Sequence, residues 1–330
     1  MSKLNVAVLM GGASAERDIS LSTGRQILQA LDTRQYSVFA LDTQPVAALP
    51  AGTPDHVRLM RSAADESPET SLTGLPLVGA SSRPDVVIVA LHGKGGEDGT
   101  VQGFLETLGI SYTGSGVLAS ALAMDKARCK TFLAACGILV PEGKVLGPHD
   151  DVPGQFARPC VVKPAMQGSS DGMTILDMQS DLSDAVAAAR KFDDSVLIEE
   201  FIEGTEITCA VLGNYELEAL PLVEIVPSKG VYDREAKYTP GATDEICPAR
   251  LPDATAQAAK EIAMTCHRAL GCRGMSRTDM IVTPVGDIFV LEVNTIPGMT
   301  PTSLLPRAAA TAGYTFTALL DKLIGFALER

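Results

Sequence analysis

Apolar and polar positions alternate with two different periods along the first third of the chain. Short apolar runs, typical of buried strands, separate stretches in which apolar residues recur every three to four positions, as in a helix. The runs cover 5–10, 36–41 and 85–91, and the helical stretches cover 20–31 and 99–108, the latter ending at Gly109. This order predicts an open parallel α/β sheet with helices on its faces. Residues 44–82, rich in Ala, Pro, Ser and Gly, predict an irregular insertion.

The pattern changes after residues 113–116, where Thr-Gly-Ser-Gly predicts a hinge. One long helix is expected over 117–136. Mixed strands and helices follow, so the chain as a whole reads as α+β. The remaining predicted strands cover 160–163, 173–176, 196–199, 206–212 and 220–226, and the remaining helices cover 182–192, 255–270 and a stretch from Phe316.

A hairpin is predicted over residues 277–294, where two β-branched runs flank a turn that contains Gly286. Residues two apart on a strand share a face, so Arg277 lies with Asp279, and Glu292 lies with Asn294. If the two faces coincide, three oxygen donors that suit Mg²⁺ lie beside a guanidinium. An edge strand with a solvated polar face explains the same pattern.

A Gly-Ser-Ser loop at 168–170 follows the strand that carries Lys163. Its backbone N–H groups suit a phosphate, to which Lys163 adds a point charge. It is not a Walker A loop, and a plain hairpin turn is the alternative.

Carboxylates and an aromatic residue end the predicted strand at 196–199 and lead into the next strand. Such a segment offers backbone groups to an adenine and Glu206 to a ribose. A polar linker is the alternative.

Two glycine-containing loops follow predicted strands at the carboxyl edge of the first sheet, where open α/β sheets bind ligands. The first holds Gly11, Gly12 and Glu16, a carboxylate for a ligand ammonium, and the second holds His92. Neither loop has the GxGxxG pattern of a dinucleotide site. A solvated Glu16 and a structural His92 are the alternatives.

A charged loop at 232–238 contains two tyrosines and Lys237. It suits a mobile lid that brings Lys237 to a phosphate. An exposed loop without a role is the alternative.

Composition narrows the class of protein. A chain of 330 residues suggests two or three domains, and 46% hydrophobic with 20% charged residues indicates a folded globular protein. The net charge of −13 argues against a nucleic-acid surface. Seven cysteines without CxxC spacing favour reduced thiols in the cytoplasm, and no apolar run predicts a secretory signal or a membrane span.

Taken together and in order, these motifs resemble the D-alanine–D-alanine ligases of the ATP-grasp superfamily. The resemblance covers nearly the whole chain except roughly 42–82. The matching residues are Gly11, Gly12, Ser14, Glu16 and Arg17; His92, Glu97, Asp98 and Gly99; Tyr112 to Gly116; Met124 to Lys126; Val162 to Pro164 with Gly168 to Ser170; Glu235, Lys237 and Tyr238; and Glu292, Asn294 and Gly298.

The resemblance implies a fold and a division of the chain. An N-terminal α/β substrate-binding domain would span 1–114. A central ATP-grasp subdomain with the phosphate loop would span 115–198, and a C-terminal subdomain with the Mg²⁺ and substrate sites would span 199–330. A cytoplasmic homodimer serving peptidoglycan synthesis, cell wall biogenesis and cell shape, with no nucleic-acid or membrane partner, is expected.

The resemblance also implies roles for individual residues. Lys126, Lys163, Ser170 and Lys237 would contact ATP phosphates, and Glu199, Phe201, Ile202 and Glu206 would hold adenine and ribose. Two Mg²⁺ ions, or Mn²⁺ in their place, would bind Asp279, Glu292 and Asn294. Glu16 and His92 would hold the first D-alanine, and Arg277, Gly298, Ser303 and Leu304 the second. Glu16, Ser169 and Tyr238 would form a catalytic hydrogen-bonded triad.

The implied reaction forms an acylphosphate on the first D-alanine, which the amine of the second attacks. Arg277 would stabilise the oxyanion, and loop closure would exclude water. Ile19, Met280 and Leu304 are expected around the substrate pocket. Gln167, Asp171 and Arg234 depart from the family pattern in the loops that should close over ATP, while Tyr238 favours an amine over D-lactate as the second substrate.

Three other functions stay open. The first is an ATP-grasp ligase for another amino-acid pair. The second is a nucleotide-binding regulatory protein without turnover, which the retained Lys163, Arg277 and Asp279 argue against. The third is a dinucleotide-dependent oxidoreductase, which the absence of GxGxxG argues against.

Overall fold

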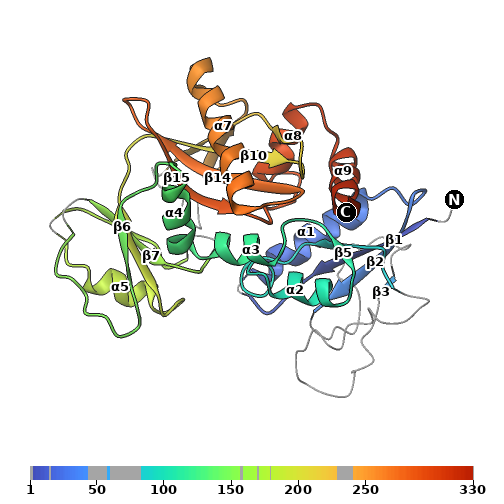
Figure 1. The fold of residues 1–330 in the computed structure, drawn as a ribbon, viewed down its shortest axis with the longest axis horizontal. Helices are drawn as coiled ribbons and strands as arrows, with labels where there is room; N and C mark the ends of the chain where they lie inside the picture. Colours follow the sequence, from blue (N-terminus) through green and yellow to red (C-terminus); the bar gives the residue numbers. More distant parts are fainter. Residues whose placement is uncertain are drawn as a thin grey trace.

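A computed structural model describes residues 3–14, 16–43, 58–59, 83–156, 159–168, 171–178, 180–228 and 241–329. Three sheets organise these residues, and in Figure 1 they lie over the right, the left and the upper part of the molecule. The predicted insertion at 44–82 falls outside the described residues except for the short strand β3 (Arg58–Leu59).

The first sheet is parallel, as predicted, with strand order β3-β2-β1-β4-β5. The other strands are β1 (Leu4–Met10), β2 (Tyr36–Asp42), β4 (Val86–Val89) and β5 (Ser111–Tyr112), and the helices are α1 (Arg17–Ala30) and α2 (Thr100–Thr107). The apolar runs of β1 and β4 are buried on both faces, which is why they do not alternate. Helix α1 begins three residues before the predicted Ser20, because Ser20 N–H already bonds to Glu16 O.

The single helix predicted over 117–136 is wrong. Two helices, α3 (Val117–Met124) and α4 (Lys126–Ala135), meet at Asp125, whose backbone is extended (φ −82°, ψ 92°). The Asp125 carboxylate accepts a hydrogen bond from Arg128 N–H at 2.9 Å and so caps α4. No Pro or Gly marks the junction in the sequence. The break places Lys126 at the start of α4.

The second sheet is antiparallel, with order β6-β9-β7-β8 and helix α5 on it. Its elements are β6 (Gly143–Leu146), β7 (Cys160–Pro164), β8 (Thr174–Leu176), α5 (Ser183–Ala189) and β9 (Val196–Glu200). Strand β6 was not predicted, because three of its four residues are exposed and carry no apolar alternation.

The third sheet is antiparallel with order β13-β12-β10-β14-β15, and β11 pairs with β10. Its strands are β10 (Thr205–Leu212), β11 (Glu218–Ala219), β12 (Val223–Pro227), β13 (Thr243–Ile246), β14 (Met275–Val282) and β15 (Ile288–Asn294), and the helices that follow or flank them are α7 (Asp253–Leu270), α8 (Leu304–Thr311) and α9 (Phe316–Leu328). The strand predicted over 220–226 is present as β12, which begins only at Val223, after Pro221, a residue that cannot donate a backbone bond.

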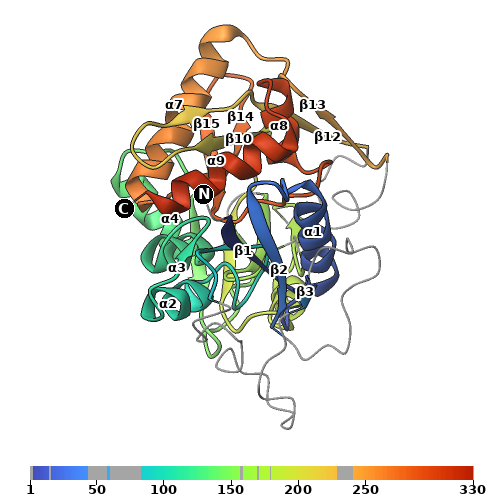
Figure 2. The same ribbon diagram turned by 90° about the vertical axis from the view of Figure 1, so that its right-hand side faces the viewer.

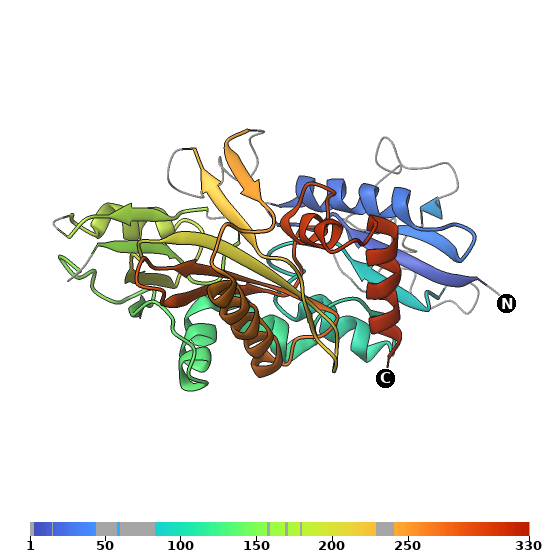
Figure 3. The same cartoon turned by 90° about the horizontal axis from the view of Figure 1, so that it is seen from above.

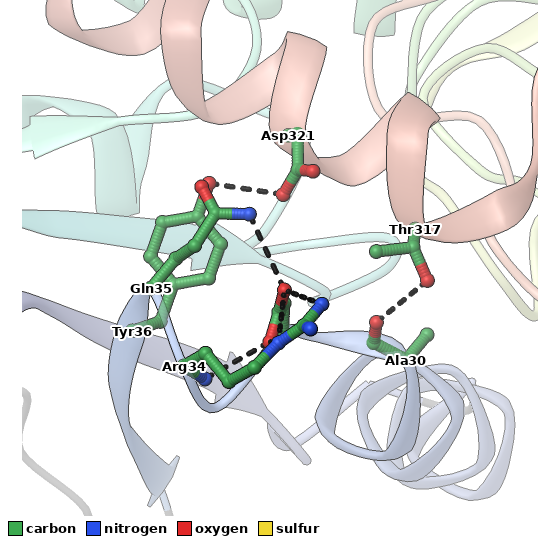
Figure 4. A network of polar contacts seen from close by, with 7 residues as sticks. Ala30, Arg34, Gln35, Tyr36, Thr317 and Asp321 are labelled. Atoms are coloured by element: carbon green, nitrogen blue, oxygen red, sulfur yellow. Dashed lines mark hydrogen bonds and ion pairs between the residues drawn. The ribbon is translucent and has the colours of Figure 1, made fainter.

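One hydrophobic core joins the first and third sheets. Helix α9 packs on α1, β4 and β5, so the end of the chain covers a face of the first sheet (Figure 2). Figure 3 shows α7 along the opposite side of the third sheet, where a second core includes α3 and α4. Tyr36 Oη donates to Asp321 Oδ1 at 2.9 Å, and Thr317 Oγ1 donates to Ala30 O at 2.9 Å (Figure 4). Among the described residues, no helix is long and apolar enough to cross a membrane.

Candidate active site

Two cavities meet where the three sheets approach one another. The first has a volume of about 470 Å³ and lies between the first and third sheets, and the second has about 620 Å³ and lies between the second and third sheets. Lys126, Gly168 and Glu292 line both. Among the described residues, these three therefore lie between a molecule in one cavity and a molecule in the other.

The predicted hairpin is present and its two polar faces coincide. Arg277 pairs with Asn294 and Asp279 pairs with Glu292 across β14 and β15, and a bulge follows Asp279. Gly286 adopts φ +95° in the turn, a conformation that glycine reaches without strain. Strand β15 is an edge strand, and its polar face is only partly exposed: the Glu292 side chain is 28% exposed, and Asp279 on the neighbouring β14 is 8% exposed.

The oxygen donors of this hairpin lie at the cavities. Asp279 accepts from Arg277 Nε at 2.9 Å, Arg277 Nη2 at 2.8 Å and Thr208 Oγ1 at 2.5 Å. Glu292 Oε2 lies 3.2 Å from Lys126 Nζ, and Asn294 Oδ1 accepts from Ile296 N–H at 2.9 Å. No three His, Cys, Asp or Glu residues in the described part of the chain form a metal cluster. Two carboxylates and one amide nevertheless suit a hard cation shared with phosphate.

Two predicted phosphate lysines point to the second cavity from different elements. Lys126, the first residue of α4, donates to Gln167 O at 2.7 Å, and Lys163 on β7 lies 2.6 Å from Glu199 Oε1. Burial would lower the pKa of Lys163, but the carboxylates of Glu199 and Glu292 outweigh it and raise the pKa. Lys163 therefore stays charged in a partly enclosed site.

The far end of the second cavity is the junction between β9 and β10. Glu199, Phe201, Ile202 and Glu206 all line it, as predicted for a nucleotide-binding segment. Phe201 N–H bonds to Pro159 O at 2.8 Å, which ties the junction to the second sheet. The outer part of the Phe201 ring stays accessible, so an apolar ring face is available in the cavity.

The first cavity brings together predicted substrate residues from both ends of the chain. Glu16, His92, Arg277, Gly298, Ser303 and Leu304 all line it, as does Ile19. At Gly298 a Cβ atom would lie 2.9 Å from Ser303 Oγ, so glycine lets these two groups approach. Burial, aided by the Arg277 charge, lowers the pKa of His92 to about 4, so this ring is neutral near pH 7.

Met280 does not line the substrate pocket, and the prediction for it is wrong. Its side chain is fully buried in the core beneath α7. Successive residues of a strand point to opposite faces. Because Asp279 faces the cavities, Met280 has to face the core.

Two ionisable groups near the cavities received no role from the sequence: Glu97, which belongs to a matching motif, and Lys130, which sequence reasoning missed. Glu97 lines the first cavity and accepts from Gly93 N–H at 2.7 Å; burial and the nearby Glu16 raise its pKa to about 8. Lys130 is buried against Glu199. Lys130 follows Lys126 by four residues on α4, and that spacing, which puts two side chains on one helix face, was the available signal.

Four predicted site residues lie outside the described residues. These are Ser169, Ser170, Lys237 and Tyr238. Their assigned roles stay predictions, as does the triad that includes Glu16. Arg234, one of the departures from the family pattern, lies outside as well, whereas Gln167 and Asp171 line the second cavity.

Comparison with known proteins gives matches over most of the chain. Family models described as the N-terminus and the C-terminus of D-Ala–D-Ala ligase match residues 5–115 and 143–325. A D-alanine–D-alanine ligase of Syntrophobacter fumaroxidans is 47% identical over 334 residues, 99% of this chain and 98% of that protein. One of Pelotomaculum thermopropionicum is 42% identical over 339 residues, with 99% and 97% covered.

Solved structures agree with these matches. The D-alanine–D-alanine ligase of Bacillus anthracis complexed with ATP has a TM-score of 0.77 and 31% identity, covering 98% of this chain and 97% of that one. The VanG D-Ala:D-Ser ligase of Enterococcus faecalis has a TM-score of 0.78 and 31% identity, with 99% and 100% covered. With both halves of the family model matched and full-length relatives above 40% identity, the chain belongs to the D-alanine–D-alanine ligase family of ATP-grasp enzymes.

Proposed function

We propose that this protein joins two D-alanines to D-alanyl-D-alanine, a peptidoglycan precursor, and consumes ATP through an acylphosphate intermediate. The observation that carries the proposal is the junction of two cavities at Lys126, Gly168 and Glu292. A nucleotide in the larger cavity and amino acids in the smaller one would meet there. Phosphoryl transfer requires such an approach, since it depends mainly on positioning and charge.

The second cavity suits ATP from end to end. Its carboxylates and Phe201 lie at the β9–β10 junction, where adenine and ribose would bind, and its lysines lie toward the first cavity, where the phosphates would extend. Lys126 and Lys163 would neutralise phosphate charge, together with Ser170 and Lys237. The family relationship supports ATP as the nucleotide.

The first cavity suits two small zwitterions. Glu16 would form an ion pair with the ammonium of the first D-alanine, and His92 would contact its carboxylate. Arg277, Gly298 N–H and Ser303 would hold the second carboxylate and the oxyanion that develops on the attacked carbonyl, and Leu304 would contact a methyl group. Donors aimed at developing charge in an enclosed site stabilise a transition state strongly.

Asp279, Glu292 and Asn294 would hold Mg²⁺, in two ions, with Mn²⁺ as an alternative. The donor set fits: each side chain offers oxygen, and Glu292 lines both cavities. When bound, Mg²⁺ would neutralise phosphate charge. Arg277 and Thr208, which already bond to Asp279, would orient its carboxylate.

Water has to be kept from an acylphosphate, which it would hydrolyse. The triad of Glu16, Ser169 and Tyr238 would link three segments of the chain and close the loops over the site. The domain boundaries at 114 and 198, the cytoplasmic location and the homodimer are part of this proposal and rest on the family relationship.

The proposal is tested by phosphate release from Mg-ATP with D-alanine, L-alanine, D-serine or no amino acid, with product masses measured. Release that depends on D-alanine, together with the mass of the D-alanine dipeptide, is expected. A mixed dipeptide formed faster than the D-alanine dipeptide would replace the proposal with another amino-acid pair. ATP binding without any amino-acid-dependent release would favour a regulatory protein.

A further inference from the structure

Lys130 is a buried lysine that none of the roles above uses. It is 6% exposed, and its ammonium contacts Glu199 Oε2, while the other carboxylate oxygen, Oε1, lies 2.6 Å from Lys163 Nζ. One carboxylate thus bridges two lysines. Lys163 and Glu199 line the second cavity and Lys130 does not; among the described residues it lines a third cavity between α4 and strands β6 and β9 of the second sheet. Lys130 therefore contacts a residue of the second cavity without lining that cavity itself.

The charges of Lys130, Glu199 and Lys163 explain why a second lysine is needed to leave positive potential for phosphates. Lys163 paired with Glu199 alone would be a neutral pair, with little positive potential left for phosphates. Lys130 brings the group to one net positive charge. Because the cavity wall is buried, charges there are screened less than at a surface. The bridged carboxylate is well stabilised, since both lysines hold the pKa of Glu199 below its usual range despite its burial.

The two lysine contacts also fix the orientation of the Glu199 carboxylate. With a lysine on each oxygen, the Glu199 carboxylate has a defined orientation, and the position of Lys163 Nζ follows from it. If an apolar side chain replaced Lys130, Oε2 of Glu199 would be buried beside that side chain and would lose its lysine partner. Glu199 would then turn toward Lys163 or toward the cavity and would compete with phosphate for the Lys163 charge.

We propose that Lys130 is a positioning residue for ATP: it balances and orients Glu199, so that Lys163 presents its charge to the phosphates. This inference rests on the proposed function only in taking ATP as the ligand of the second cavity. It assigns Lys130 no contact with substrate. The expected signature is weaker binding of ATP with little change in the use of D-alanine.

The test compares Lys130→Met, which removes the charge at similar length, with Lys130→Arg, which keeps it. Binding of Mg-ATP without D-alanine is measured by calorimetry, and KM for ATP, KM for D-alanine and kcat are measured by phosphate release. Lys130→Met should weaken ATP binding and raise its KM by about tenfold or more, with KM for D-alanine unchanged. Lys130→Arg should keep most of the wild-type affinity for ATP. Lys144→Met, which removes an exposed lysine of the same third cavity, should change neither constant.

A double-mutant cycle shows whether Lys130 acts through Lys163. The losses of ATP affinity in Lys130→Met and Lys163→Met should not add in the double variant. Removing Lys163 already removes the group through which Lys130 acts on ATP. Additive losses, or a folded Lys130→Met protein with normal ATP affinity, would overturn the inference. If the methionine variant does not fold, Lys130→Gln, which keeps a donor to Glu199 without the charge, carries the same test. Because calorimetry needs no dipeptide formation, a failure of the proposed reaction stays distinct from a failure of this inference.

Discussion

At the scale of single residues, Arg277 occupies the centre of the candidate site. Its guanidinium makes a paired contact with Asp279 on the same strand, and it lines the cavity assigned to the amino acids. Arg277→Ala should lower kcat by at least about a hundredfold, as loss of an oxyanion donor does, while ATP binding in the second cavity persists. Phosphate release and ATP calorimetry measure the two properties. Turnover at the wild-type rate would remove Arg277 from its assigned role.

His267 gives the protein a pH-dependent stability. This ring is 1% exposed, its Nδ1 lies 2.8 Å from Ser276 Oγ, and burial lowers its pKa from 6.5 to about 4. Between these two values the unfolded chain binds a proton that the folded chain does not, so the free energy of unfolding falls as pH drops from 6.5 to 4. The full loss from this group is about 3 kcal/mol.

Urea unfolding of the wild type and His267→Gln at pH 7 and pH 4.5 measures this effect. The wild type should be the more stable at pH 7, and its advantage should shrink or reverse at pH 4.5, since glutamine takes up no proton. Comparing the two proteins cancels the contribution of His92, whose pKa is lowered in the same way. His149→Gln, at an exposed position, is the control. An equal difference at both pH values would contradict the argument.

At the scale of elements, the junction of α3 and α4 links local stability to the site. Asp125→Ala removes the cap of α4 and should cost about 1 kcal/mol of folding free energy. It should also raise KM for ATP, because Lys126 follows Asp125 directly. Urea unfolding and phosphate release measure both effects. Asp125→Asn keeps an acceptor for Arg128 N–H and should retain most of both properties; equal damage by Ala and Asn would indicate a role for the charge instead.

The elements also show what could be predicted from sequence. Alternation along β14 and β15 predicted one polar face on each strand, and the register shows that the two faces coincide. The apolar runs predicted the parallel sheet. Local patterns could not predict the break at Asp125, the exposed β6 or the core position of Met280. The contact of Lys130 with Glu199 joins residues 69 apart, so it depends on where the fold places α4 relative to β9.

At the scale of the whole molecule, the core shared by the first and third sheets should couple their unfolding. Leu320 on α9 is fully buried in this core, and Leu320→Ala should cost about 2–5 kcal/mol. Hydrogen exchange should accelerate both in β1 and in β10 if the two sheets open together. Leu328→Ala, at a position 37% exposed on the same helix, should have a much smaller effect. Faster exchange in only one of the two sheets would show that they unfold separately.

The packing of α9 on the first sheet also has a consequence for synthesis on the ribosome. Tyr36 reaches its partner Asp321 only across 285 residues, and the apolar face formed by Val6, Val8 and Met10 belongs to the same core as Leu319 and Leu323. The first sheet is made early, yet α9, the helix that completes its core, is made much later. Until α9 leaves the ribosome, the nascent chain carries an uncovered apolar sheet face, the kind of surface that chaperones bind.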